Sequence, residues 1–233
     1  MLAVRKSNDR GHANHGWLDS KFSFSFADYY DPKFMGFRSL RVINEDVIQG
    51  GGGFGTHGHR EMEIVTYVLE GGIAHKDSIG SGGVITPGEL QHMSAGTGIR
   101  HSECNASATT AAHMLQIWLI PSKQGIEPSY SQQKFPVHEE RNLLHLLASQ
   151  DGRNGSLKWV TNAELYAAKL DAGVKIEHAI PQLKHSWVQV ARGSVVVNGE
   201  TLEQGDAVAI SDEAEVSIQA GKDSAEVLFF ELG

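Results

Sequence analysis

The sequence has few of the features that mark secreted and membrane proteins. Its 233 residues include one cysteine, Cys104, so no internal disulfide can form and a reducing compartment is expected. No apolar run is long enough to cross a bilayer, and the first residues lack the apolar centre of a signal peptide. We therefore expect a soluble cytoplasmic protein that has no membrane partner.

Clusters of basic residues are missing as well. The formal net charge is -8, with 20 Lys and Arg against 28 Asp and Glu, and the basic residues form no dense run. Because an acidic surface repels phosphate backbones, direct binding to nucleic acid is not expected. The chain also lacks a G-x-S-x-G motif, a P-loop and a dinucleotide fingerprint, because its glycine clusters do not lie between a strand and a helix in the required order.

Glycine is abundant, with 26 residues against 6 prolines, and it often bounds short apolar runs. Runs such as LRVINEDVI, EIVTYVLEG and AEVLFFEL are rich in the residues that favour strands. Helical patterns are few. Residues 140–150 give the best one, although a mostly buried strand fits that stretch equally well. The pattern predicts an all-β protein.

The two halves of the chain share a plan. From Thr66 and again from Val188 we find a strand, a glycine turn, a second strand and a glycine–acid turn that leads into another strand. Repeated supersecondary units predict two similar β-domains. The polar stretch 121–140 is interpreted as their connection, which places the domains at 1–125 and 126–233.

Two pairs of potential metal ligands follow glycine-rich turns. His57 and His59 are two residues apart in GGGFGTHGHREME, and His101 and Glu103 are two apart in AGTGIRHSECN. Side chains at this spacing face the same side of a strand, so neighbouring strands could gather all four. Three imidazoles and a carboxylate suit a divalent first-row metal with open positions for water, dioxygen or substrate. A lone H-x-H is more often an ordinary polar face, but two such pairs together favour a metal site.

The spacing leaves the carboxylate ligand open. Glu61 and Glu63 share the facing of His59 if its strand continues, so they compete with Glu103 for this role. Gln116 has two interpretations of equal weight. Its side chain either points into the barrel, toward a metal-bound water or substrate, or is a partnered core glutamine.

Other histidines are interpreted as structural. His92 and His113 are expected to support the fold, and His12 and His15 are expected in a loop, as a cap or a contact surface. Cys104 should point away from Glu103 and be an inert thiol.

Three phenylalanines alternate in FSFSFADYY. Phe22, Phe24 and Phe26 would share one face of a strand, which is usually core packing, and we expect that role rather than an aromatic wall for a substrate.

These motifs resemble those of cupins. The first cupin motif, G-x5-H-x-H-x3-E, is matched from Gly51 to Glu63, although the following glycine comes one residue late, at Gly71. The second motif, G-x2-H-x3-N, is matched from Gly98 to Asn105, with Gly96 where a proline is usual.

More specifically, FGTHGHREMEIVTYVLEG and PGELQHMSAGTGIRHSE resemble the pirin family of bicupins. The opening RGHANHGWLDSKFSFSFADYYDP is similar to the bacterial pirin-like quercetinases. The resemblance is dense over about residues 5–120 and thinner beyond. It implies two jelly-roll-like cupin barrels with few short helices.

The resemblance also implies a site and an activity. The site is of the Fe(II) type, with other first-row divalent metals as alternatives, and its ligands are His57, His59, His101 and Glu103. In pirins the carboxylate comes from the second motif, which selects Glu103 over Glu63. The implied activity is that of a quercetin 2,3-dioxygenase, in which both atoms of dioxygen enter a flavonol whose ring opens with release of carbon monoxide. Glu103 would then be both a ligand and a transient base. The alternative is an iron-binding regulatory protein that acts through a protein partner, with incidental turnover.

The second half is expected to be a cupin without a metal. Matching Gly193 to Gly71 gives an offset of about 122 residues. This offset carries His57 and His59 onto Ala179 and Pro181, which cannot ligate through a side chain. No histidine follows His185.

Overall fold

The computed structural model describes residues 1–233 and confirms the all-β prediction. Two 3-10 turns, η1 (Ser7–Asp9) and η2 (Arg153–Gly155), are the only helical elements. Of the two interpretations of 140–150, the strand is confirmed and the helix is wrong, because β13 (His145–Ser149) lies in this stretch and pairs with two other strands. None of the helical elements has the length and apolarity to cross a membrane.

By contacts, the chain falls into two compact units. The unit that we call the N-terminal barrel comprises Gly11–Phe135 and Trp159–Thr161, and the C-terminal barrel comprises Met1–Arg10, Pro136–Lys158 and Asn162–Gly233. A division of independently folding domains at residue 125 stays a prediction.

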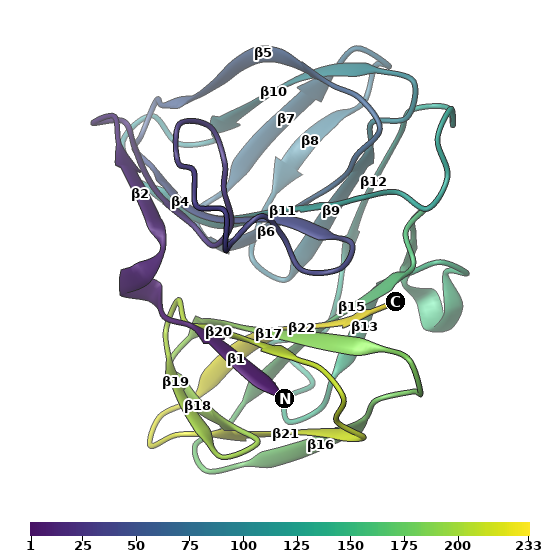
Figure 1. Ribbon diagram of the computed structural model, residues 1–233. Helices are drawn as coiled ribbons and strands as arrows, with labels where there is room; N and C mark the ends of the chain where they lie inside the picture. Colours follow the sequence, from purple (N-terminus) through teal and green to yellow (C-terminus); the bar gives the residue numbers. More distant parts are fainter. The chain divides into compact units, whose positions relative to one another are not determined.

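The N-terminal barrel is built from two antiparallel sheets (Figure 1). The larger sheet has the order β12-β9-β6-β11-β4-β3-β2, and the smaller one has the order β5-β10-β7-β8. The strands are β2 (Gly11–Asn14), β3 (Leu18–Phe22), β4 (Leu40–Ile48), β5 (Gly53–His59), β6 (Glu63–Glu70), β7 (Ile73–Asp77), β8 (Gly82–Ile85), β9 (Glu89–Ser94), β10 (Ile99–Asn105), β11 (Ala112–Leu119) and β12 (Ser129–Lys134). The stretch 121–140 is therefore more than a connection, because β12 pairs with β9.

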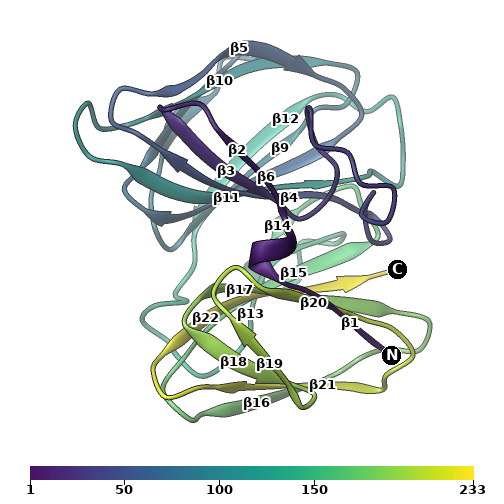
Figure 2. The same cartoon turned by 60° about the vertical axis from the view of Figure 1, so that its left-hand side comes forward.

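The C-terminal barrel repeats this construction. Its larger sheet has the order β1-β20-β17-β22-β15-β13-β14, and the smaller sheet, visible in Figure 2, has the order β16-β21-β18-β19. The further strands are β1 (Leu2–Arg5), β14 (Leu157–Lys158), β15 (Ala163–Leu170), β16 (Lys175–Ala179), β17 (His185–Arg192), β18 (Ser194–Val197), β19 (Glu200–Glu203), β20 (Ala207–Ile210), β21 (Glu215–Ala220) and β22 (Ala225–Leu232).

The two barrels correspond strand by strand, which confirms the predicted repeat. The order β9-β6-β11-β4 in one equals β20-β17-β22-β15 in the other, and β5-β10-β7-β8 equals β16-β21-β18-β19. Gly71 and Gly193 make the equivalent turns with φ of 72° and 71°, a left-handed conformation that glycine adopts at little cost.

The interiors of the barrels differ. In the C-terminal barrel one continuous apolar cluster runs from Ala168 to Phe229 and fills the space between its sheets. In the N-terminal barrel one apolar cluster lies around Ile48 and Met114, and another lies around Ile64 and Met93. Polar side chains and a cavity lie on the remaining interior surface of this barrel.

Candidate metal centre

Two neighbouring strands carry the predicted ligands. β5 and β10 pair so that His57 lies opposite His101, and an extra residue on β5 then shifts the register so that Glu103 lies opposite Phe54. His101 and Glu103 are two residues apart on the regular strand β10, and both are buried. Gly53 permits the close approach of the two strands. A Cβ at this position would lie 2.6 Å from the Cα of Cys104 and 2.7 Å from the carbonyl oxygen of Glu103, so a larger residue would push β5 away from the site.

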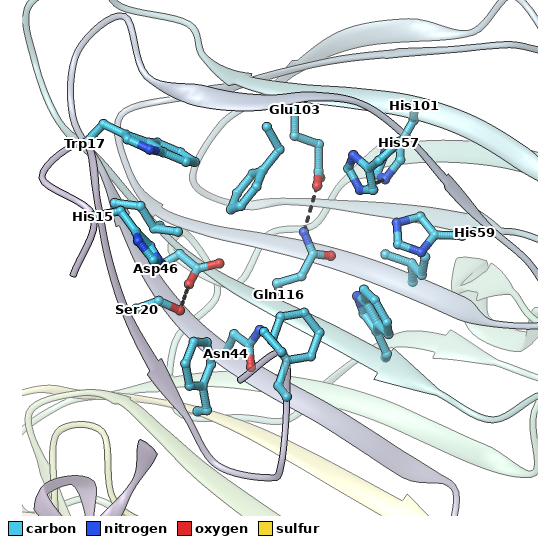
Figure 3. A pocket seen from close by; sticks show the side chains of 17 residues that line it. His15, Trp17, Ser20, Asn44, Asp46, His57, His59, His101, Glu103 and Gln116 are labelled. Carbon is cyan, nitrogen blue, oxygen red and sulfur yellow. Dashed lines mark hydrogen bonds between the residues drawn. The ribbon is translucent and has the colours of Figure 1, made fainter. Parts of the chain in front are cut away.

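Three histidines converge inside the barrel (Figure 3). Ligating nitrogens of His57, His59 and His101 all lie within 4.8 Å of one another. The Nε2 atoms of His57 and His101 are 3.1 Å apart. The Nδ1 atom of His57 is 2.8 Å from the Gly55 carbonyl oxygen, so it donates there and leaves Nε2 with a lone pair for the centre.

The environment keeps the rings of His59 and His101 neutral. Burial, together with the neighbouring His57, lowers the pKa of His59 to about 4. Burial and then the charges of His57, His59 and His75 lower the pKa of His101 to about 3. Neutral imidazole is the form that binds metal ions, so the nitrogens are ready to ligate at pH 7.

Glu103 is held by two donors from the opposite sheet. The Oγ1 hydroxyl of Thr66 donates to its Oε1 over 3.0 Å, and Nε2 of Gln116 donates to its Oε2 over 2.9 Å. Ligand atoms of Glu103, His101 and His75 lie within 4.8 Å of one another, so the carboxylate belongs to a second group that shares His101 with the first. Gln116 therefore points into the barrel and contacts the carboxylate itself.

A buried chain of hydrogen bonds lies behind His101. Its Nδ1 is 3.4 Å from Nδ1 of His75, whose Nε2 is 3.2 Å from Oδ2 of Asp77. The other Asp77 oxygen accepts two backbone N–H groups, and the ring of Tyr130 stacks on His75 at 4.7 Å. Burial raises the pKa of Tyr130 to about 12, with Asp77, Glu89 and Glu103 adding to the rise. The chain fixes the His101 ring with Nε2 toward His57.

The competing carboxylates face elsewhere. β5 ends at His59, and Glu61 lies in a turn with φ of 49°, so the alternation on which their shared facing depended is broken. Glu63 begins β6 and is fully buried, where it accepts hydrogen bonds from His92 and Ser94. His92 is thus structural, as predicted.

The histidines meet a cavity of about 530 Å³ (Figure 3). Aromatic side chains form much of its wall, with Phe26 packed edge-on against Trp118 at 5.3 Å. Phe22 and Phe26 line this cavity whereas Phe24 does not. The expectation of core packing is confirmed for Phe22 and Phe24, which are buried, although Phe22 also lines the cavity. It is wrong for Phe26, because β3 ends at Phe22 and the strand alternation does not continue.

The remaining predicted residues lie as follows. His113 is bonded to Glu45 at 3.0 Å, and Cys104 is exposed and faces away from the interior. His12 bonds to Asp19, whereas His15 lines the cavity, which the sequence interpretation did not anticipate.

Sequence reasoning overlooked two further pairs with the same spacing. His75 and Asp77 form an H-x-D pair in IAHKD, a signal equal in kind to the two that were used. Asn44 and Asp46 are two residues apart in LRVINEDVI and lie on the same face of the strand as Val42 and Ile48. Polar residues therefore occupy the buried face of a largely apolar strand. Both signals were present in the sequence.

In the C-terminal barrel, Ala179 is exposed on β16, whereas the neighbouring His178 contacts the core through the ring of Phe229. Ile180 follows it into the apolar cluster. His178 lies 3.4 Å from Glu231, but no group of three ligating side chains occurs in this barrel.

Comparisons with known proteins agree on both halves of the chain. The family model "Pirin" matches residues 3–119, and that of the "Quercetinase C-terminal cupin domain" matches residues 146–232. A quercetin 2,3-dioxygenase of Escherichia coli K12 is 51% identical over 232 residues, covering 100% of this chain and 99% of the relative. A putative quercetin 2,3-dioxygenase of Pseudomonas aeruginosa is 44% identical, with 100% of both chains covered.

A solved structure is similar throughout. The bacterial pirin YhhW from Escherichia coli, in complex with nickel(II), superposes with a TM-score of 0.94 at 51% identity and covers 100% of this chain and 99% of its own. That relative binds a divalent transition metal.

Proposed function

This chain belongs to the pirin family of bicupins, and from that premise we propose that it is a metal-dependent dioxygenase that cleaves a flavonol such as quercetin. The observation that carries the proposal is the convergence of His57, His59 and His101 at the wall of a largely aromatic cavity. The full-length similarity to a quercetin 2,3-dioxygenase supports the same activity.

The donor set fits a divalent first-row metal ion. Three imidazoles whose nitrogens lie within 4.8 Å of one another can share one ion, with Glu103 as the carboxylate ligand beside His101. His75 and Asp77 support the site from behind by holding the His101 ring. When bound, such an ion would orient the substrate and dioxygen and stabilise the substrate anion. We infer iron(II) as the native ion.

The side chains of the cavity supply the remaining steps. Phe26 and Trp118 hold the flat rings of the flavonol against an apolar wall. Glu103 takes the proton of the reacting hydroxyl, and Thr66 and Gln116 keep its carboxylate oriented during the transfer. The wall also limits access of water to the substrate.

The activity predicts a defined gas balance. Protein loaded with iron(II) is expected to consume dioxygen with quercetin and to release carbon monoxide in a ratio of about one to one, because both dioxygen atoms enter the product while one ring carbon leaves. An oxygen electrode together with carbon monoxide detection measures both. Apoprotein and boiled loaded protein are the controls. Equal rates with loaded protein and apoprotein would mean uncatalysed autoxidation, and the regulatory protein that acts through a partner would then be the better proposal.

We also propose that the C-terminal barrel binds no metal. Protein purified without chelators is expected to hold one tightly bound ion per chain, because the C-terminal barrel pairs His178 with Glu231 but brings no third ligating side chain to them. Metal analysis by mass spectrometry gives the ratio. His57→Ala should lower it toward zero, whereas His178→Ala should leave it at one. A ratio near two that survives His57→Ala would contradict this proposal.

A further inference from the structure

The cavity has a second polar region beside the proposed metal ligands. Ser20 on β3 pairs with Asp46 on β4, and Asn44 on β4 pairs with Gln116 on β11, so the four form a patch on the interior face of the larger sheet. All four line the cavity, and Figure 3 shows the Asp46 carboxylate beside Ser20, away from the three histidines.

Two acceptors in this patch have no partner. Ser20 Oγ donates a hydrogen bond to Asp46 at Oδ1, so Oδ2 is the oxygen of this carboxyl that is left for a ligand in the cavity. Oδ1 of Asn44 and Oε1 of Gln116 are buried and lack a partner. These side chains are 2%, 3% and 7% exposed for Asp46, Asn44 and Gln116. Because buried polar groups in finished cores are almost always bonded, such acceptors at a cavity wall point to a ligand that donates to them.

Burial of the Asp46 carboxyl lowers the stability of the folded protein at neutral pH. Burial raises its pKa to about 7; Glu103 and Glu45 add to the rise, and Ser20 and His113 oppose it. The folded protein therefore gives up stability as pH rises from about 4 to about 7, the range in which the unfolded chain is already ionised. A carboxyl placed this way in a cavity is typical of functional sites.

We propose that Asp46, with Asn44 beside it, accepts a hydrogen bond from a phenolic hydroxyl of the substrate that is remote from the metal, and that it thereby selects polyhydroxylated flavonols. The inference rests on the proposed function for its substrate class. Asp46 is the diagonal neighbour of Gln116 across the sheet, about 7–8 Å away between Cα atoms. Gln116 in turn donates to Glu103, so a flavonol whose reacting hydroxyl lies at Glu103 extends along this face of the sheet and presents a hydroxyl of a neighbouring ring to Asp46.

The test compares quercetin with 3-hydroxyflavone, which has the reacting hydroxyl and no other. Asp46→Asn is expected to lower the ratio of kcat/KM for quercetin over 3-hydroxyflavone by about 10- to 100-fold, the usual effect of a hydrogen bond to a charged group. Glu45→Gln is the matched control, because it makes the same change at the next residue of β4, on the outer face where Glu45 bonds to His113. Its ratio should equal that of the wild type.

Anaerobic binding separates this inference from the proposed activity. Quenching of tryptophan fluorescence by each flavonol gives dissociation constants without turnover, since Trp17 and Trp118 line the cavity. If Asp46→Asn weakens the binding of quercetin more than that of 3-hydroxyflavone, the subsite is supported even when no dioxygen is consumed. If the wild type binds quercetin but never converts it, only the proposed activity is refuted. Equal weakening of both flavonols, or weakening of neither, overturns the subsite. At pH 8, Asp46→Asn should also unfold at a higher temperature than the wild type, and the difference between the two melting temperatures should decrease toward pH 4. A cooperative unfolding transition of the variant shows that it is folded.

Discussion

Replacing His101 with alanine is expected to release the metal ion and to lower kcat/KM for quercetin by at least about 100-fold. Loss of a residue that only supports a ligand already costs 10- to 100-fold, and removing the ligand itself opens the site. His101 is 1% exposed, and its Nε2 lies 3.1 Å from that of His57, so its loss removes a buried ligand from the centre of the group. Metal content after purification without chelators and dioxygen uptake with quercetin measure the two effects.

His113→Ala is the matched control. It removes the same side chain from β11, where His113 bonds to Glu45 outside the cavity, and it should keep both metal and activity. His57→Ala is expected to behave as His101→Ala does. If both ligand variants bind metal as well as the wild type, the proposed centre is wrong.

The general fold was predictable because its signals are local. Short β-branched runs and glycine turns recur at equivalent places, and Gly71 and Gly193 mark the repeat. The sequence could not decide between helix and strand at 140–150, because a short apolar run fits both equally well. The pairing of β13 with β15 shows that it is a strand. The pairing of Leu2 with Ile210 has no local signal at all.

The gathering of His57, His59 and His101 was predictable from strand alternation, and the same rule shows where such reasoning stops. Strand alternation predicts on which face of a sheet a side chain lies, but only within an unbroken strand. The turn at Glu61 ends the alternation after His59. On β16, His178 rather than Ala179 contacts the core. The partners of Glu103 come from β6 and β11, and no spacing in the sequence reveals that these side chains meet.

Replacing Glu63 with glutamine is expected to destabilise the protein by about 3–5 kcal/mol while leaving its metal content unchanged. Glu63 is fully buried and accepts hydrogen bonds from His92 at 2.7 Å, Ser94 at 2.6 Å and the backbone N–H of Val160 at 3.2 Å. An amide places an N–H group against donors, and breaking a buried charged network of this kind costs that amount. Urea unfolding at pH 7 and metal analysis of the same preparation give the two results.

The pH dependence and a surface control identify the cause of this loss. Burial alone would raise the pKa of Glu63, but the bonds and charge of His92, with Ser94 and Val160, outweigh it and lower the pKa below its ordinary value. A lowered pKa means that the carboxylate stabilises the fold at neutral pH, and that this contribution fades as pH falls below about 4.5 toward the folded-state value. The gap between Glu63→Gln and the wild type should therefore narrow in acid. Glu89→Gln, which alters a carboxylate bonded to Thr86 near the surface, should cost less than about 1 kcal/mol. If Glu63→Gln instead removes the metal and Glu103→Gln does not, the ligand is Glu63, and the first cupin motif rather than the second supplies the carboxylate.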